Sequence, residues 1–73
     1  MKDDNIILVR VLEQIRKVAQ EKSWFTEQSK ELSQELGYST SQIGAAFKNL
    51  RIKFLPDIIV EKLNNRNWVI RRR

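Results

Sequence analysis

The sequence predicts one small domain that is mainly α-helical and ends in an antiparallel β-hairpin. Three observations support this fold class. Apolar residues recur at helical spacing in successive segments before residue 55. The single proline, Pro56, closes the last of these segments, and the residues after it combine β-branched runs with turn-forming asparagines. A chain of 73 residues is long enough for one modest core, so we expect a single domain over residues 1–73.

The first helix is expected from about Asp4 to Lys22. Its apolar residues, separated by one, three or four positions, fall on one face. They are Ile7, Leu8, Val11, Leu12, Ile15, Val18 and Ala19. Ile6 and Val9 lie beside this stripe, so we expect them to be partly exposed or to contact a partner. A brief extended segment should follow around Trp24 and Phe25.

The second helix is expected from about Glu27 to Leu36. Thr26 precedes it as the predicted N-cap, and Leu32 and Leu36 face inward. Gly37 stands where a helix C-terminus needs a residue that accepts positive φ. The stretch "LGYSTSQI" therefore predicts a very short connection between two helices.

A third helix is predicted directly after this turn, because Ser39 and Gln42 have the spacing of a capping box. Its inward side should carry Ile43, Phe47, Leu50 and Phe54. Pro56 ends it, and Leu55 is biased away from helix because it precedes a proline. Ile52 does not fit: a continued helix directs it outward, which suggests either a helix end near Arg51 or an interface.

After Pro56, the apolar residues no longer recur at helical spacing. The run "DIIVEKL" is rich in β-branched residues, "NNRN" is typical of a turn, and "WVIRRR" again resembles a strand. An antiparallel hairpin follows from this pattern. Turns of two, three or four residues around Asn64 to Asn67 all fit, so its register stays open. The large aromatic residues are interpreted as core: Trp24, Phe25, Phe47, Phe54 and Trp68, with Tyr38 covering the turn.

Composition argues against catalysis and against bound metals. The chain has no cysteine and no histidine, which excludes disulfides and zinc sites of the Cys/His kind. Its carboxylates are scattered, and its two glycines form no phosphate-binding loop. We therefore expect no enzyme activity and no cofactor. The acidic start and the absence of a long apolar run predict a cytoplasmic protein, with the nucleoid, or the nucleus in a eukaryote, as the alternative location.

Positive charge is concentrated in the second half of the chain. Residues 1–36 hold six Lys and Arg against seven Asp and Glu, a net charge of −1. Residues 37–73 hold eight Lys and Arg against two Asp and Glu, a net charge of +6. Such asymmetry indicates a surface for a polyanion, although a solvated basic face that aids solubility has the same composition.

The stretch from Ser29 to Leu50 resembles the helix-turn-helix pattern. Gly37 takes the turn position, Ile43 and Ala46 take buried positions of the second helix, and Ser33 stands where alanine is usual. With the hairpin, the whole chain resembles the winged helix-turn-helix DNA-binding family, with the helical unit at about 27–54 and the wing at about 57–73. The resemblance implies three helices plus a C-terminal wing.

This resemblance implies sequence-specific binding of double-stranded DNA, in a small transcriptional regulator or a DNA-binding accessory protein. The helix over 40–51 would enter the major groove, where amides of Gln42 and Asn49 can pair with adenine, Ala45 can touch a thymine methyl and Lys48 can reach guanine or phosphate. The hairpin would grip the flanking backbone or minor groove. The candidate residues are Ser39, Thr40, Ser41, Gln42, Gly44, Ala45, Lys48, Asn49, Lys62, Arg66, Arg71, Arg72 and Arg73.

Two alternatives share the same fold. A winged helix can instead dock a protein through the third helix or the wing, and the outward Ile52 favours that interpretation. The chain could also bind nucleic acid without sequence preference, through phosphates alone. Within the DNA-binding interpretation, Ile6 or Val9 on the first helix could hold a homodimer on paired half-sites.

Overall fold

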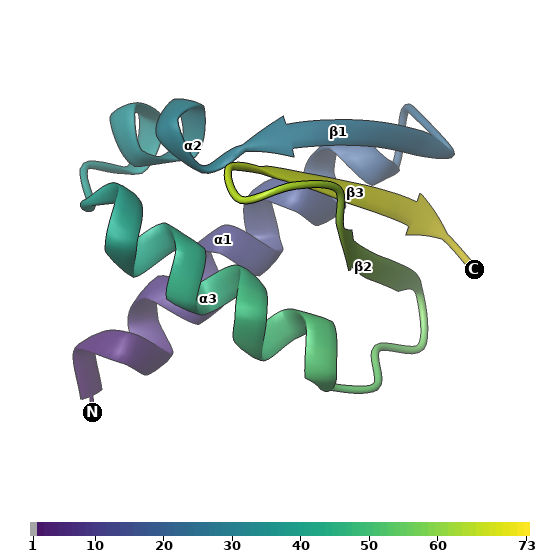
Figure 1. Cartoon of the computed structure of the whole chain (residues 1–73). Helices are drawn as coiled ribbons and strands as arrows, with labels where there is room; N and C mark the ends of the chain where they lie inside the picture. Colours follow the sequence, from purple (N-terminus) through teal and green to yellow (C-terminus); the bar gives the residue numbers. More distant parts are fainter. Residues whose placement is uncertain (1) are drawn as a thin grey trace.

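The computed structural model describes residues 2–73 and contains three helices and a three-stranded antiparallel sheet (Figure 1). The elements are α1 (Lys2–Ala19), β1 (Trp24–Gln28), α2 (Ser29–Leu36), α3 (Thr40–Ile52), β2 (Ile58–Lys62) and β3 (Asn67–Arg72). The predicted helices and the C-terminal hairpin are thus confirmed, with a loop of residues 63–66 between β2 and β3. In the part of the chain that is described, no helix is both long and apolar enough to cross a membrane.

The sheet joins the middle of the chain to its end. Its order is β1-β3-β2, so β3 pairs with both neighbours and places Phe25 and Val60 on either side of Ile70. The extended segment predicted around Trp24 is therefore a full strand. Because this strand continues to Gln28, α2 begins at Ser29 and not at Glu27, and the prediction of Thr26 as its N-cap is wrong.

The helices and the inner face of the sheet enclose one core. Val11 and Ile15 of α1, Leu32 of α2 and Phe47 of α3 are fully buried. Trp68 of β3 is buried among them: its ring stacks on that of Phe47, with centroids 5.1 Å apart and an interplanar angle of 13°. The Trp68 Nε1–H donates to Ser29 Oγ at 3.1 Å, which gives the indole the hydrogen-bond partner that burial requires.

Two aromatic residues predicted to lie in the core are exposed. Trp24 is 57% exposed because it alternates with Phe25 along β1 and so points to the outer face of the sheet. Phe54 is 78% exposed because α3 ends at Ile52 and Lys53 already has extended backbone, which breaks the helical spacing. The outward Ile52 is 81% exposed, whereas Leu55 turns into the core.

The end of α1 also differs from the prediction. The helix ends at Ala19, three residues before Lys22. The helix ends in a tighter turn, because the backbone N–H groups of Glu21 and Lys22 both donate to the carbonyl of Val18 at 3.0 Å. The predicted exposure of Ile6 and Val9 is confirmed, at 51% and 52%.

The connection between α2 and α3 has the predicted caps. Gly37 adopts φ 80°, and its N–H donates to the Ser33 carbonyl at 2.9 Å. The Ser33 hydroxyl in turn donates to the carbonyl of Tyr38, so the serine at this position stabilises the turn. Ser39 Oγ accepts from the Gln42 N–H at 3.1 Å, and Gln42 Oε1 accepts from the Ser39 N–H at 2.9 Å. These bonds fix where α3 begins.

Alanine should have opposite effects at the two glycines. Gly37→Ala forces a side chain into positive φ and should lower the free energy of unfolding by about 1–2 kcal/mol. Gly44→Ala adds a methyl group in open space inside α3 and should raise it by about 0.5–1 kcal/mol. Urea denaturation followed by circular dichroism measures both. Equal shifts in the same direction would contradict this account of the turn.

Candidate nucleic-acid interface

The outward side of α3 is polar, small and exposed. Successive residues of a helix are about 100° apart, so Ser41, Ala45 and Lys48 share one side. All of them are exposed, whereas Ile43 and Phe47 on the opposite side are fully buried. The predicted orientation of α3 is therefore confirmed. Figure 1 shows α1 behind α3, and no other element crosses in front of α3 in that view.

A groove of about 720 Å³ runs between α3 and the hairpin loop. It brings together parts of the chain that are far apart in sequence. Its lining residues are Ser29, Lys30, Thr40, Ser41, Gly44, Lys48, Lys62, Asn65, Arg66 and Trp68. We call this feature the basic groove, because its charged lining residues within the described chain are all cations. Low-dielectric walls carrying charge of one sign concentrate the field toward an anionic ligand.

The loop between β2 and β3 is held against α2 by a backbone hydrogen bond and is shaped internally by the Asn64 side chain. The Ser29 N–H, at the start of α2, donates to the carbonyl of Arg66 at 3.1 Å. Asn64 Oδ1 accepts from the N–H groups of Arg66 and Asn67 at 3.0 and 3.1 Å, and from Asn67 Nδ2 at 2.8 Å. The predicted turn residues thus shape a defined loop, which places Arg66 at the basic groove.

The hairpin also contributes Lys62. Its Nζ lies 5.9 Å from the centroid of the Trp68 ring, within the range of a cation–π contact. Trp68 is only 1% exposed, so it supports the groove from below and offers no free face for stacking a base. Lys62 therefore lies over a rigid aromatic support beside Lys48 and Arg66.

The three C-terminal arginines do not line the basic groove. Figure 1 shows the β2–β3 loop beside the junction of β1 and α2, and the C-terminus at the other end of β3. Arg71 pairs with Trp24 and Ile59 across the sheet, on the outer face, and forms an ion pair of 2.6 Å with Glu61. The N–H of Arg72 donates to the Ser23 carbonyl at 2.9 Å.

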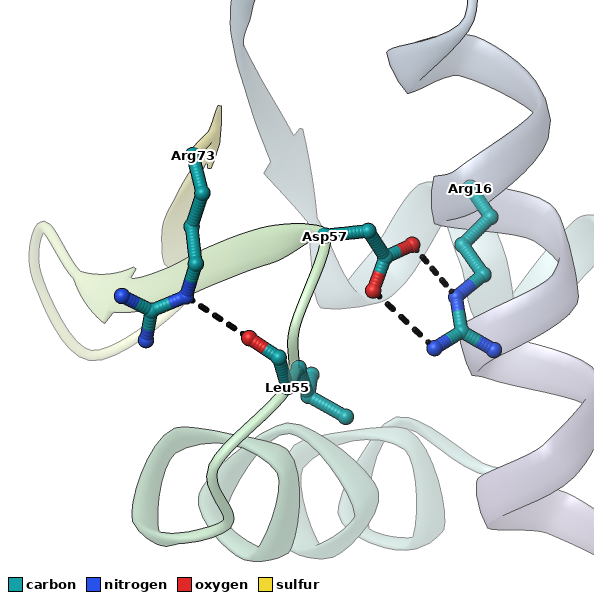
Figure 2. Close-up of polar contacts among 4 residues, drawn as sticks. All are labelled: Arg16, Leu55, Asp57 and Arg73. Carbon is teal, nitrogen blue, oxygen red and sulfur yellow. Dashed lines mark hydrogen bonds and ion pairs between the residues drawn. The ribbon is translucent and has the colours of Figure 1, made fainter.

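The side chain of Arg73 contacts the segment between α3 and β2 (Figure 2). Its Nε–H donates to the Leu55 carbonyl at 2.7 Å, and its guanidinium lies 4.7 Å from the centroid of the Phe54 ring. Next to it, Arg16 of α1 forms a two-pronged pair with Asp57, at 2.8 and 3.1 Å. This pair lowers the pKa of Asp57 through the Arg16 hydrogen bonds. The single basic wing expected from the sequence is thus divided between two ends of the sheet.

The remaining candidates differ in what their side chains can do. Ser39 and Gln42 are exposed but bond each other in the capping box. Asn49 is exposed on the flank of α3 away from the groove. Sequence reasoning missed Lys30 and Asn65, which line the groove. Lys30 lies in the first turn of α2, and only the tertiary contact between α2 and the hairpin loop gives it a place in the site.

Glu27 is the strongly perturbed acid. Its pKa is raised from 4.5 to about 7, first by burial and then by the charges of Glu31 and Glu35. It lies on β1 opposite Trp68, whereas Lys62 pairs with Trp68 from the other side. The acidic residues Glu27, Glu31 and Glu35 are absent from the lining of the basic groove, so the groove keeps one sign of charge.

The raised pKa of Glu27 predicts a pH dependence of stability. The folded state holds this proton more tightly than the unfolded chain, so stability is lost as the pH rises from about 4.5 to about 7. Glu27→Gln should remove this loss and stabilise the protein at pH 8 by about 1 kcal/mol, after allowance for the solvent that reaches the carboxyl. Thermal unfolding at pH 5 and pH 8 measures the effect. Glu13→Gln, the same change at an exposed site on α1, is the control and should leave the pH dependence intact.

The geometry defines a small α/β domain with a cationic groove beside an exposed helix. No protein-family model, curated protein or solved structure matches the chain significantly. In the described residues, no three carboxylates gather closely enough to hold a metal ion. Function is therefore inferred from the basic groove and the exposed face of α3.

Proposed function

We propose that this chain is a winged helix-turn-helix domain that binds double-stranded DNA. In this proposal α3 enters the major groove, and the β2–β3 hairpin lies on the flanking backbone. The order of α2, a short turn through Gly37, α3 and a hairpin supports it. The biological role proposed with it is that of a small transcriptional regulator or a DNA-binding accessory protein.

The observation that carries the proposal is the basic groove. Lys30, Lys48, Lys62 and Arg66 come from α2, α3 and the hairpin, and they meet along one side of the exposed face of α3. A duplex presents phosphates on both sides of its major groove, which suits cations placed beside an inserted helix. The small residues at Ser41, Gly44 and Ala45 allow the backbone of α3 to approach the bases closely.

Binding to duplex DNA in solution tests the proposal. Fluorescence anisotropy of a labelled 24-base-pair duplex of mixed sequence, between about 50 and 300 mM NaCl, gives the affinity and its salt dependence. Four groove cations on phosphates predict a slope of log K against log salt of about −3.6. The proposal fails if no saturable binding occurs at the lowest salt, or if affinity does not depend on salt.

Protein docking is the second candidate, because Ile52 and Phe54 are 81% and 78% exposed at the end of α3. A dimer through the exposed Ile6 and Val9 of α1 is compatible with either function. Analytical ultracentrifugation over a concentration series, with and without DNA, distinguishes a monomer from this dimer. Monomers under all conditions would contradict the dimer.

A further inference from the structure

Ile52 is the most exposed large apolar residue in the described chain, at 81%. Isolated apolar residues on a surface need no explanation by themselves. Ile52, however, follows Ser41, Ala45 and Lys48 at steps of four, three and four, so it continues the outward stripe of α3. It therefore lies on the face that the proposed function directs toward DNA.

Ser41 and Lys48 supply the polar groups of this stripe, and Gln42 lies beside it. Gln42 Oε1 accepts the Ser39 N–H at 2.9 Å, which holds this amide at the start of the helix. An adenine edge takes both a donor and an acceptor from one amide, so Gln42 would have to share its capping oxygen to read adenine in the two-bond manner. Gly44 has no side chain, and Ala45 and Ile52 offer only methyl groups. The stripe thus alternates the polar Ser41 and Lys48 with the apolar Ala45 and Ile52.

We propose that Ala45 and Ile52 recognise the C5-methyl groups of thymine in the major groove, an inference that rests on the proposed DNA binding. Among the base pairs of DNA, only those with thymine present a methyl group there. Ala45 and Ile52 are seven residues apart, which is about 10 Å along a helix, or about three base-pair steps. The two contacts therefore favour sites with thymines about three base pairs apart.

Lys48 between them favours DNA over a protein partner as the occupant of this stripe. A protein interface that buried Ala45 and Ile52 would also have to take the Lys48 ammonium out of water, which is costly without a paired anion. In a DNA complex the same ammonium reaches a phosphate or a guanine edge. Lys48 also lines the basic groove, so stripe and groove form one continuous surface.

Replacing thymine by uracil removes only the methyl group and tests the proposal directly. The probes are two labelled 20-base-pair duplexes of alternating sequence, one of dA and dT and one of dA and dU, compared by anisotropy at one salt concentration. One buried methyl is worth about fourfold in affinity. The wild-type protein should therefore prefer the thymine duplex by between about fourfold and fifteenfold.

Variants separate direct methyl recognition from differences in DNA shape. Ile52→Ser should reduce the thymine preference by about fourfold. Ile6→Ser makes the same change at an exposed isoleucine on α1 and should leave the preference unchanged. Lys48→Gln should weaken binding to both duplexes equally. Thermal unfolding checks that each variant folds.

Three results overturn the inference. Equal affinity of the wild-type protein for both duplexes contradicts methyl recognition and leaves DNA binding intact. If Ile52→Ser keeps the full preference for the thymine duplex, then DNA shape or another residue produces that preference. Failure to bind either duplex at low salt removes the proposed function together with this inference.

Discussion

Trp68→Ala is expected to lower the free energy of unfolding by about 3–5 kcal/mol. The substitution removes the largest fully buried side chain, its stacking on Phe47 and its hydrogen bond to Ser29. A domain of 73 residues has a free energy of unfolding of about 4–11 kcal/mol, so the substitution should remove a large part of the stability. Urea denaturation at 25 °C, followed by far-ultraviolet circular dichroism, measures the loss.

Trp24→Ala is the matched control. Trp24 is 57% exposed on the outer face of the sheet, so its removal should cost less than about 1 kcal/mol. Similar losses at the two tryptophans would contradict the packing of the sheet against the helices. Loss of the groove should accompany unfolding in Trp68→Ala, since Trp68 supports Lys62 from below.

Replacing three groove cations should abolish most DNA binding. The triple variant Lys48→Gln, Lys62→Gln and Arg66→Gln removes cations that α3 and the hairpin contribute to the groove. At about 1 kcal/mol or more for each charged contact, affinity should fall by about 100-fold or more. The slope of log K against log salt should become shallower by about 2.7. The anisotropy assay with the 24-base-pair duplex measures both quantities.

A second triple variant controls for net charge. Arg10→Gln, Lys17→Gln and Lys22→Gln remove the same charge from exposed positions on and just after α1. This variant should lose far less affinity, because its cations lie outside the basic groove. Comparable losses in the two variants would mean that overall charge, and not the groove, attracts the DNA.

Local signals predicted much of this fold. The apolar periodicity of α1 and α3, the positive φ of Gly37 and the capping box at Ser39 depend on residues within one or two helical turns. Such signals can be recognised in a single sequence because the interactions behind them form between residues that are close in the chain. The same logic gave the orientation of α3, and hence the exposure of Ser41, Ala45 and Lys48.

Features that depend on distant contacts were predicted less well. The strand β1 exists because it pairs with β3, about forty positions further along the chain, as in Phe25 with Ile70. That pairing alternates the side chains, which exposes Trp24, and it moves the start of α2 to Ser29. A single sequence carries no comparable signal for which strands become neighbours.

The candidate site shows the same division. Of the candidates on α3, Thr40, Ser41, Gly44 and Lys48 line the groove. For the hairpin, the charge count could not separate Arg66, at the loop, from the C-terminal arginines at the other end of β3. Arg71 has a partner in Glu61, and the side chain of Arg73 bonds the Leu55 carbonyl.

A titration of isotopically labelled protein with a short duplex, followed residue by residue in ¹⁵N–¹H NMR spectra, tests the central claim most directly. Binding through the basic groove predicts shifts at Lys30, at residues 40–52 and at residues 62–66, with exposed residues of α1 such as Glu13 and Lys17 unmoved. Shifts confined to α1, or to the outer face of the sheet around Trp24 and Arg71, would contradict it.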